Sequence, residues 1–390
     1  MNVPKRILPI IVFSQFAGTS MWFAGNAILP QIQEDWALPE TAIAHVTSLV
    51  MLGFITGTFA FALLSVSDRF RSTKVFLISS LLGALFNLSL IFLPESFAVL
   101  LIARFLTGIS LAGIYPVGMK IASDWYKGNL GKALGYLVGA LVLGSAFPHL
   151  LNHTRSQLPW SFVLISTSAI ATTGGLAMFY LVGEGPYRTQ GAKFQPQKMF
   201  DVFRKPEFRA AAFGYFGHMW ELYTLWAFLP IVLTYYNTTH STTIPVSLWT
   251  FIIMAGGAIG CVVGGYVSQR IGSAKVAFLY LSITGIFCLI SPLFYELPQE
   301  LFLAVFFIWG VAVIGDSPQF SSLNALTAPV AYRGTAITIA VSIGFLLTIP
   351  SIQLLGLLSK SLDLKWLLFT LLIGPIFGLI STRPLLKTGQ

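Results

Sequence analysis

The chain has 390 residues, of which 55% are hydrophobic and only 9% are charged, and its formal net charge is +9. A soluble domain carries about 25% charged residues, so this composition excludes a soluble globular protein and indicates one that lies mostly in a lipid bilayer. No phosphate-binding loop of the G-x-x-x-x-G-K-S/T type occurs, which excludes ATP hydrolysis by that route.

Apolar segments of about 20 residues, each long enough to cross roughly 30 Å of hydrocarbon, recur along the whole chain. The first is too long for the apolar part of a signal peptide and no small-residue cleavage site follows it, so we expect it to stay in the mature protein. In chain order we predict twelve membrane-spanning helices, at residues 7–28, 41–65, 75–93, 97–121, 132–150, 160–182, 210–235, 246–267, 275–294, 300–325, 335–357 and 364–382.

The basic residues are distributed unevenly among the predicted loops. If the N-terminus is cytoplasmic, all but four of the 23 Lys and Arg lie in cytoplasmic loops or tails. The exceptions are Arg155, Lys360 and Lys365 outside and Arg104 within a span. This pattern follows the positive-inside rule with both termini in the cytoplasm. The positive charge therefore reports topology, so we expect no nucleic-acid partner and place the chain as a multi-pass protein in a cell membrane, first of all the bacterial inner membrane.

A basic segment at 183–209 separates two sets of six spans. We therefore divide the chain into an N-terminal six-helix bundle (1–182), a cytoplasmic linker (183–209) and a C-terminal six-helix bundle (210–390). Landmarks recur at an offset near 200, as a duplication predicts. The loop LSVSDRFRSTKV from Leu64 matches GYVSQRIGSAKV from Gly265, and a second set matches at an offset of 202: Gly108, Gly113 and Pro116 with Gly310, Gly315 and Pro318.

These features resemble the major facilitator superfamily of secondary transporters, across nearly the whole chain. The loop after the second span is similar to that family's G-x-x-x-D-R-x-G-R-R/K motif at Asp68, Arg69 and Lys74, although Leu64 and Arg71 stand where the motif has glycine.

Two further spans bear on this resemblance. IARFLTGISLAGIYPVG in the fourth span resembles the family's R-x-x-x-G element through Arg104 and Gly108. The fifth span has Ala140 where the signature of many drug exporters has proline, which weakens an assignment as a drug and proton antiporter without excluding it.

The resemblance implies alternating access between two six-helix bundles, with a central cavity lined by the first, fourth, seventh and tenth spans. It also implies that the loop after the second span acts as a gate on the cytoplasmic side. We assign six residues to this gate: Asp68, Arg69, Arg71, Lys74, Asp124 and Arg270.

Small-residue faces are a second feature that bears on motion. Glycines stand at four-residue spacing in the second, fifth and eighth spans, which lets helix backbones approach closely: Gly53 and Gly57; Gly131, Gly135 and Gly139; Gly256, Gly260 and Gly264. Such faces suit either rocking of the two bundles against each other or static packing, and we favour rocking.

Ionisable residues inside the predicted spans carry the main functional prediction. A charge at the bilayer centre costs at least about 2.5 kcal/mol on insertion scales and is usually kept for a function. We assign four such residues to proton coupling: Arg104, His218, Glu221 and Asp316. Glu221 is the first candidate, because a carboxyl group shielded from water favours its neutral form and can carry a proton. His218 lies three residues away on the same side of the helix, where its charge would oppose that preference.

Polar and aromatic residues of the same spans are candidates for substrate binding. Gln15, Thr19, Trp22 and Asn26 recur at a spacing that places them on one helical face, and Tyr223 and Trp226 could surround an organic group. The alternatives are hydrogen bonds between helices and ordinary aromatic packing. The full candidate set is Gln15, Thr19, Trp22, Asn26, Arg104, Tyr115, Tyr223, Trp226 and Gln319.

We therefore predict a monomeric secondary active transporter that moves a small organic solute by alternating access, coupled to protons. The alternatives are an uncoupled facilitator, a multidrug or metabolite exporter of the same fold and, more distantly, an integral-membrane enzyme. His149 and His153 lack an evident nucleophile or carboxylate partner, so we expect no enzymatic activity. Cys261 and Cys288 lie in spans without metal-ligand spacing, so we expect no disulfide, metal or cofactor. Arg104 suggests an anionic substrate group and Glu221 a cationic one, so the substrate stays open, as does the direction of transport.

Overall fold

The computed structural model describes residues 3–126, 130–154, 158–188, 195–329, 331 and 333–387, with the backbone alone for 34, 67, 68 and 130–132. Within these residues the secondary structure is entirely helical. The chain divides into two compact units, Met1–Gly191 and Ala192–Gln390. The boundary lies inside 183–209, the segment predicted as a linker. Asp68, predicted for the gate, lies outside the described side chains.

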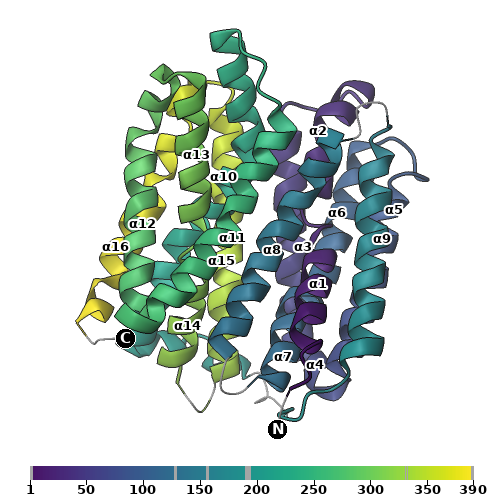
Figure 1. The fold of residues 1–390 in the computed structure, drawn as a ribbon, viewed down its shortest axis with the longest axis vertical. Helices are drawn as coiled ribbons and strands as arrows, with labels where there is room; N and C mark the ends of the chain where they lie inside the picture. The colour runs from purple at the N-terminus through teal and green to yellow at the C-terminus, as the bar shows by residue number, and fades with distance from the viewer. Residues whose placement is uncertain are drawn as a thin grey trace. The chain divides into compact units, whose positions relative to one another are not determined.

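The first unit runs from purple to teal in Figure 1, where α4 and α7 lie at the end that holds the N-terminus and α2 lies at the opposite end. Its helices in the described residues are α1 (Ile7–Thr19), α2 (Ala24–Asp35), α3 (Ala42–Leu63), α4 (Val66–Arg69), α5 (Ser72–Ser89), α6 (Phe97–Ala112), α7 (Tyr115–Trp125), α8 (Leu130–Thr154), α9 (Ser161–Ala177) and the π-helical η1 (Met178–Val182).

The second unit runs from teal to yellow in Figure 1. Its α-helices in the described residues are α10 (Pro206–His240), α11 (Val246–Ile271), α12 (Ser273–Ile290), α13 (Gln299–Val313), α14 (Ser317–Thr327), α15 (Arg333–Leu358) and α16 (Ile373–Leu386). Short 3₁₀ turns accompany them: η2 (Pro196–Lys198), η3 (Asp201–Arg204), η4 (Ser291–Glu296), η6 (Leu364–Trp366) and η7 (Leu368–Leu372).

Eleven helical stretches in the described residues are long and apolar enough to cross a membrane, and each overlaps a predicted span. The predicted seventh span, 210–235, lies within the 35-residue helix α10. This helix carries Arg209, His218 and Glu221 and is not among the eleven, so the count of twelve spans remains a prediction.

Three of these stretches are broken near their middle, and two of the breaks follow the repeated landmarks. The α6–α7 break lies at Gly113–Ile114, just before Pro116, and the α13–α14 break lies at Ile314–Asp316, just before Pro318. Proline fits the first turn of a helix, but it has no N–H to bond the carbonyl four residues earlier and its ring clashes with that carbonyl, so a helix cannot continue unbroken through it. The sequence repeat is therefore also a repeat of helix breaks, whereas the third break, between α1 and α2, contains no proline.

Glycines bring equivalent helices together in both units. A Cβ atom on Gly108 of α6 would lie 2.2 Å from the carbonyl oxygen of Val50 on α3, and one on Gly310 of α13 would lie 2.0 Å from that of Ile253 on α11. Gly53 and Gly57 likewise face α6, and Gly256 and Gly260 face α13. These glycine contacts of α3 and α11 each lie within one unit, so static packing explains the four-residue spacing there. On α8 no described atom lies within 4 Å of a Cβ on Gly135, so packing of this kind does not explain that position, and rocking stays a prediction.

The close approach at Gly108 predicts a loss of stability in Gly108→Ala. The added methyl group would push a backbone carbonyl, and overpacking of this kind costs about 1–3 kcal/mol. Gly135→Ala on α8 is the matched control, because no described atom lies within 4 Å of its added methyl group and alanine favours the helix by about 1 kcal/mol. In thermal denaturation of the purified protein, only Gly108→Ala should melt earlier; equal melting of both variants would contradict the packing.

Candidate functional site

The α13–α14 break places Asp316 at the start of a helix inside the second unit. Gly315 makes room for the ring of Tyr280, whose nearest atom lies 2.7 Å from where a Cβ would be. The Tyr280 hydroxyl donates to the carbonyl oxygen of Gly260 at 3.2 Å, which ties α12 to α11 beside the break. The Asp316 side chain is 1% exposed, so it lies in protein rather than in lipid or water.

His218 of α10 is the partner of Asp316. Its Nδ1 lies 2.8 Å from Asp316 Oδ1, within the distance of an ion pair. Among the described residues, neither Asp316 Oδ2 nor His218 Nε2 has a hydrogen-bond partner. The rings of Tyr215 and Phe320 have centroids 6.0 and 6.1 Å from the imidazole. The pair is therefore buried and flanked by aromatic groups, so the charge of each member strongly affects the other.

Glu221, one turn further along α10, has different partners. Its Oε1 accepts a hydrogen bond from Trp309 Nε1 of α13 at 3.0 Å and lies 3.7 Å from Cys288 Sγ of α12. The structure thus brings together the three residues of this unit that were predicted for proton coupling: His218, Glu221 and Asp316. His218 pairs with Asp316, whereas Glu221 accepts a hydrogen bond from the Trp309 indole. Trp309 was missed in the sequence, because the break between α13 and α14 separates it from Asp316 and no helical spacing links the two.

The corresponding position in the first unit is apolar. An offset of 200 relates His218 to Gly18, and an offset of 202 relates Asp316 to Ile114. A Cβ atom on Gly18 would lie 2.5 Å from the side chain of Ile114, which is fully buried. The same helix contact is therefore ionic in one unit and apolar in the other.

Arg104 of α6 holds the α1–α2 break of the first unit. Its Nη2 donates to the carbonyl oxygens of Met21 and Trp22 at 2.6 and 2.9 Å, and its Nη1 donates to Asn87 Oδ1 at 2.9 Å. These carbonyl groups lie in the break, where, within the described residues, they accept no hydrogen bond from a helical N–H group. Arg104 is fully buried, and all its partners in the described residues are uncharged.

Asn87 extends this network to α9. Its Nδ2 donates to Leu164 O, Thr167 Oγ1 and Ser168 Oγ at 3.0–3.2 Å. Ser20, in the break itself, donates through Oγ to the carbonyl oxygen of Thr167 at 3.4 Å. Arg104 thus joins the broken helix to α5 and α9, and its predicted roles in substrate binding and coupling stay predictions.

The predicted polar stripe is divided by the same break. Thr19 on α1 donates to the carbonyl oxygen of Gln15 at 2.8 Å, whereas Asn26 on α2 donates through Nδ2 to Thr47 Oγ1 at 2.7 Å. Both amide atoms of Gln15 and the Oδ1 of Asn26 are buried without a partner in the described residues. These atoms could serve a solute, and the predicted role in binding remains open.

The other substrate candidates are distributed over both units. Trp22 is buried in the α1–α2 break, and Tyr115 is half-buried at the start of α7. In the second unit the ring of Tyr223 lies 5.5 Å from that of Trp226 and 5.2 Å from that of Phe345, and Gln319 is buried in α14. Aromatic packing between α10 and α15 therefore accounts for Tyr223, and a solute contact remains a prediction.

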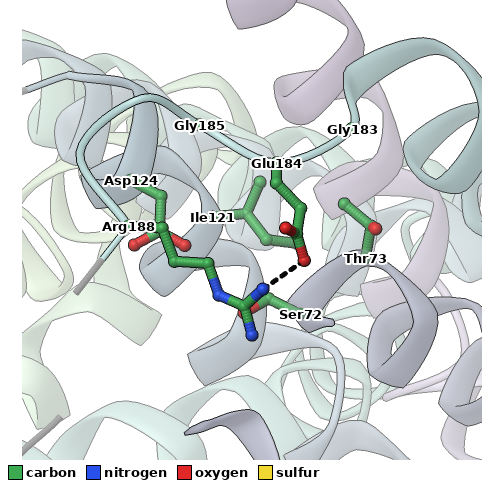
Figure 2. A pocket seen from close by; sticks show the side chains of 8 residues that line it. All are labelled: Ser72, Thr73, Ile121, Asp124, Gly183, Glu184, Gly185 and Arg188. Atoms are coloured by element: carbon green, nitrogen blue, oxygen red, sulfur yellow. Dashed lines mark hydrogen bonds and ion pairs between the residues drawn. The ribbon is translucent and has the colours of Figure 1, made fainter. Parts of the chain in front are cut away.

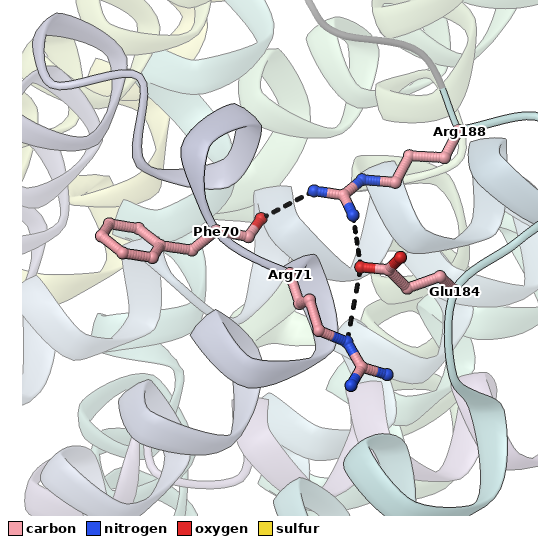
Figure 3. A network of polar contacts seen from close by, with 4 residues as sticks. All are labelled: Phe70, Arg71, Glu184 and Arg188. Atoms are coloured by element: carbon pink, nitrogen blue, oxygen red, sulfur yellow. Dashed lines mark hydrogen bonds and ion pairs between the residues drawn. The ribbon is translucent and has the colours of Figure 1, made fainter.

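A second polar site lies at the end of the first unit that the sequence predicts to be cytoplasmic. Figure 3 shows the Glu184 carboxylate between two guanidinium groups: Arg188 pairs with it, and Arg71 Nε lies 3.4 Å from its Oε1. Arg188 also donates through Nη2 to the carbonyl oxygen of Phe70 at 3.1 Å. Glu184 and Arg188 were missed in the sequence, although a Glu and an Arg four residues apart directly follow the sixth span.

This cluster borders a small surface pocket. Figure 2 shows its lining residues: Ser72, Thr73, Ile121, Asp124, Gly183, Glu184, Gly185 and Arg188. The Tyr187 N–H donates to the carbonyl oxygen of Asp124 at 2.9 Å, which fastens the segment after η1 to the end of α7. Of the predicted gate residues, Arg71 and Asp124 thus meet this segment, while Arg69, Lys74 and Arg270 are exposed.

The exposure of this cluster predicts a small energetic effect for Glu184→Gln. Ion pairs this exposed contribute about 0–1 kcal/mol, so the melting temperature should change little, but cleavage by trypsin after Arg188 should become faster because, among the described residues, its side chain keeps only the contact with Phe70. Asp201→Asn in η3, which removes the pairing with Lys198 and Arg204, is the control and should leave that cleavage unchanged. Equal protection of Arg188 in both variants would refute the contact.

Comparisons with known proteins agree with this architecture. The sequence model described as Major Facilitator Superfamily matches residues 11–352. The gallate transporter of Pseudomonas putida is 26% identical over 412 residues, covering 95% of this chain and 88% of the relative. The 4-hydroxybenzoate transporter PcaK of Pseudomonas putida is 22% identical, covering 86% and 81%.

Among solved structures, a bacterial homologue of the human lysosomal transporter Spinster, in an inward-facing and unoccupied conformation, superposes with a TM-score of 0.75. The match covers 98% of this chain and 97% of that one at 14% sequence identity. At this identity the likeness establishes the shared fold.

Proposed function

The chain belongs to the Major Facilitator Superfamily and is a multi-pass membrane transporter; from this premise we propose that it carries an aromatic or related organic acid by alternating access, with protons as the coupling ion. Relatives named for gallate and 4-hydroxybenzoate transport support this substrate class. Their bacterial origin agrees with the bacterial inner membrane predicted from the sequence.

The observation that carries the proposed coupling is the buried ion pair of His218 and Asp316. In dry surroundings the two groups together are most stable when their charges cancel, with one proton shared between imidazole and carboxylate. A second proton converts the pair into a cation, which an accompanying anion would stabilise. Opening of the site to water on one side of the membrane would then favour release of both.

Glu221 is the second carboxyl group of this cluster and the alternative carrier. It interacts electrostatically with both His218 and Asp316, and the Trp309 indole can donate to it whether or not it is ionised. We place it second because its hydrogen-bond partners, the Trp309 indole and the Cys288 thiol, are donors and not bases, so they offer no second site for its proton.

Uptake by proteoliposomes tests the proposed function. Radiolabelled 4-hydroxybenzoate and gallate are offered with an inward proton gradient, without a gradient, and to empty liposomes. We expect accumulation above the outside concentration only with protein and gradient together. Uptake that stops at equal concentrations would indicate the uncoupled facilitator, and no uptake of either acid would overturn the proposed substrate class.

A further inference from the structure

We propose that His218 binds the carboxylate of the transported acid through Nε2, and that the protonation of Asp316 decides when it can do so. The inference rests on the proposed function, since it assumes that an organic acid is carried. It assigns to His218 a contact with substrate in addition to its contact with Asp316.

The two imidazole nitrogens of His218 have unequal surroundings. Nδ1 faces Asp316, whereas Nε2 is buried without a hydrogen-bond partner in the described residues. A buried polar group left without a partner destabilises the folded state, so a ligand oxygen that reached Nε2 would be bound favourably. A carboxylate oxygen is the strongest such acceptor, because the bond is charge-assisted when the imidazole is protonated.

Competition from other cations is small. In the described part of the second unit, His218 is the one buried side chain that can carry a positive charge. Arg104, in the first unit, already donates to three oxygen atoms. An anion that enters the second unit would therefore find its counter-charge at His218.

The groups around the imidazole suit an aromatic acid. Tyr215 and Phe320 have ring centroids about 6 Å from it, and both rings lie against glycine: a Cβ on Gly344 would be 2.3 Å from the Tyr215 ring, and one on Gly214 would be 2.4 Å from the Phe320 ring. Aromatic rings favour tilted or offset contacts at such distances. A carboxylate at Nε2 would therefore place its attached ring among aromatic neighbours.

Asp316 provides the switch. While it is ionised, its charge neutralises the imidazolium, and the pair has little attraction for an anion. When it takes up a proton, the positive charge of His218 becomes available to the carboxylate of the substrate. Other ionisable groups nearby are Glu221 on α10, and Cys261 on α11 and Tyr280 on α12, which both interact with Asp316. The α15 and α16 helices, which also pack against α10, carry only the exposed Arg333 and Arg383.

The test compares an acid with its uncharged analogue. Binding of 4-hydroxybenzoate and of 4-hydroxybenzamide to the purified full-length protein is measured by calorimetry between about pH 6 and 8, where the acid stays ionised. In the wild type, affinity for the acid should rise several-fold as the pH falls, and affinity for the amide should not change. An acid affinity that does not depend on pH would overturn the role of Asp316.

Three variants locate the effect. His218→Asn keeps a donor near Asp316 but lacks the Nε2 group, and His218→Gln places an uncharged donor near the Nε2 position. In both variants the ratio of the affinity for the acid to the affinity for the amide should fall at least tenfold. His149→Gln is the matched control, because His149 is buried on α8 with an unpartnered Nε2 and has no carboxylate partner among the described residues.

The possible outcomes separate the two proposals. If the wild type binds neither compound, the proposed substrate class fails. If it binds the acid and both folded His218 variants keep the wild-type preference, the inference on His218 fails alone. If His149→Gln loses the preference instead, the carboxylate site lies in the first unit. Because the wild-type pH series needs no variant, the result does not depend on the folding of any substitution.

Discussion

Asp316→Asn is expected to abolish accumulation driven by a pH gradient, so that the ratio of inside to outside substrate falls to one. The amide replaces the carboxyl group of the buried pair with a group of similar shape that cannot exchange a proton. Exchange of substrate across the membrane without a gradient should continue, because His218 stays in place. Proteoliposome accumulation and counterflow, measured on one preparation, check both expectations.

Glu221→Gln is the matched control for this variant. It neutralises the other buried carboxyl group of the cluster and keeps an acceptor for the Trp309 indole, so accumulation should persist. If Glu221→Gln instead removes accumulation and Asp316→Asn retains it, the coupling carboxylate is Glu221, as the sequence analysis first proposed. Loss of counterflow in Asp316→Asn would mean that this side chain is needed for substrate binding or movement itself.

Arg104→Ala is expected to lower the free energy of unfolding by about 3 kcal/mol or more. The substitution leaves three buried oxygen acceptors, on Met21, Trp22 and Asn87, without their donor, and each such loss costs about 1–3 kcal/mol. Thermal denaturation in detergent measures the effect, together with the yield of monodisperse protein.

Arg71→Ala is the matched control for Arg104→Ala. Arg71 is about half exposed and pairs with Glu184, so its loss should cost less than about 1 kcal/mol. Arg104→Lys should lie between the two, because an ammonium group can reach some of the three oxygen atoms but not in the planar arrangement of a guanidinium. A wild-type melting temperature for Arg104→Ala would show that the network does not stabilise the break.

Hydropathy and repeated residues predict much of this fold, but they do not predict which side chains contact one another. The spans follow from uninterrupted apolar sequence, and the breaks before Pro116 and Pro318 follow from the missing N–H of proline and the clash of its ring with the preceding turn. The break between α1 and α2 falls in SMWF, at residues 20–23, which contains neither glycine nor proline. Nothing local marks it, since the charge that stabilises it comes from Arg104, more than 80 residues later.

The partner of His218 shows the same limit. Helical spacing predicts that His218 and Glu221 share a side of α10, yet each turns to a different residue of the broken helix, Asp316 and Trp309. Which carboxylate contacts the imidazole depends on how α13 and α14 pack against α10. A single sequence does not predict how these helices are aligned against one another. The sequence therefore predicted that these residues belong to the candidate site, but it did not predict which of them pair.

The paired positions Gly18–Ile114 and His218–Asp316 bear on the descent of the chain. If both units come from one ancestral half, the backbone contact was inherited by both copies, but only the later copy holds ionisable side chains there. The converse holds at Arg104, whose counterpart at an offset of 202 is the buried Phe306. A tandem protein built from two second halves would carry two ion pairs and no guanidinium at the break of its first helix. The two halves thus differ in chemistry at both of these equivalent positions.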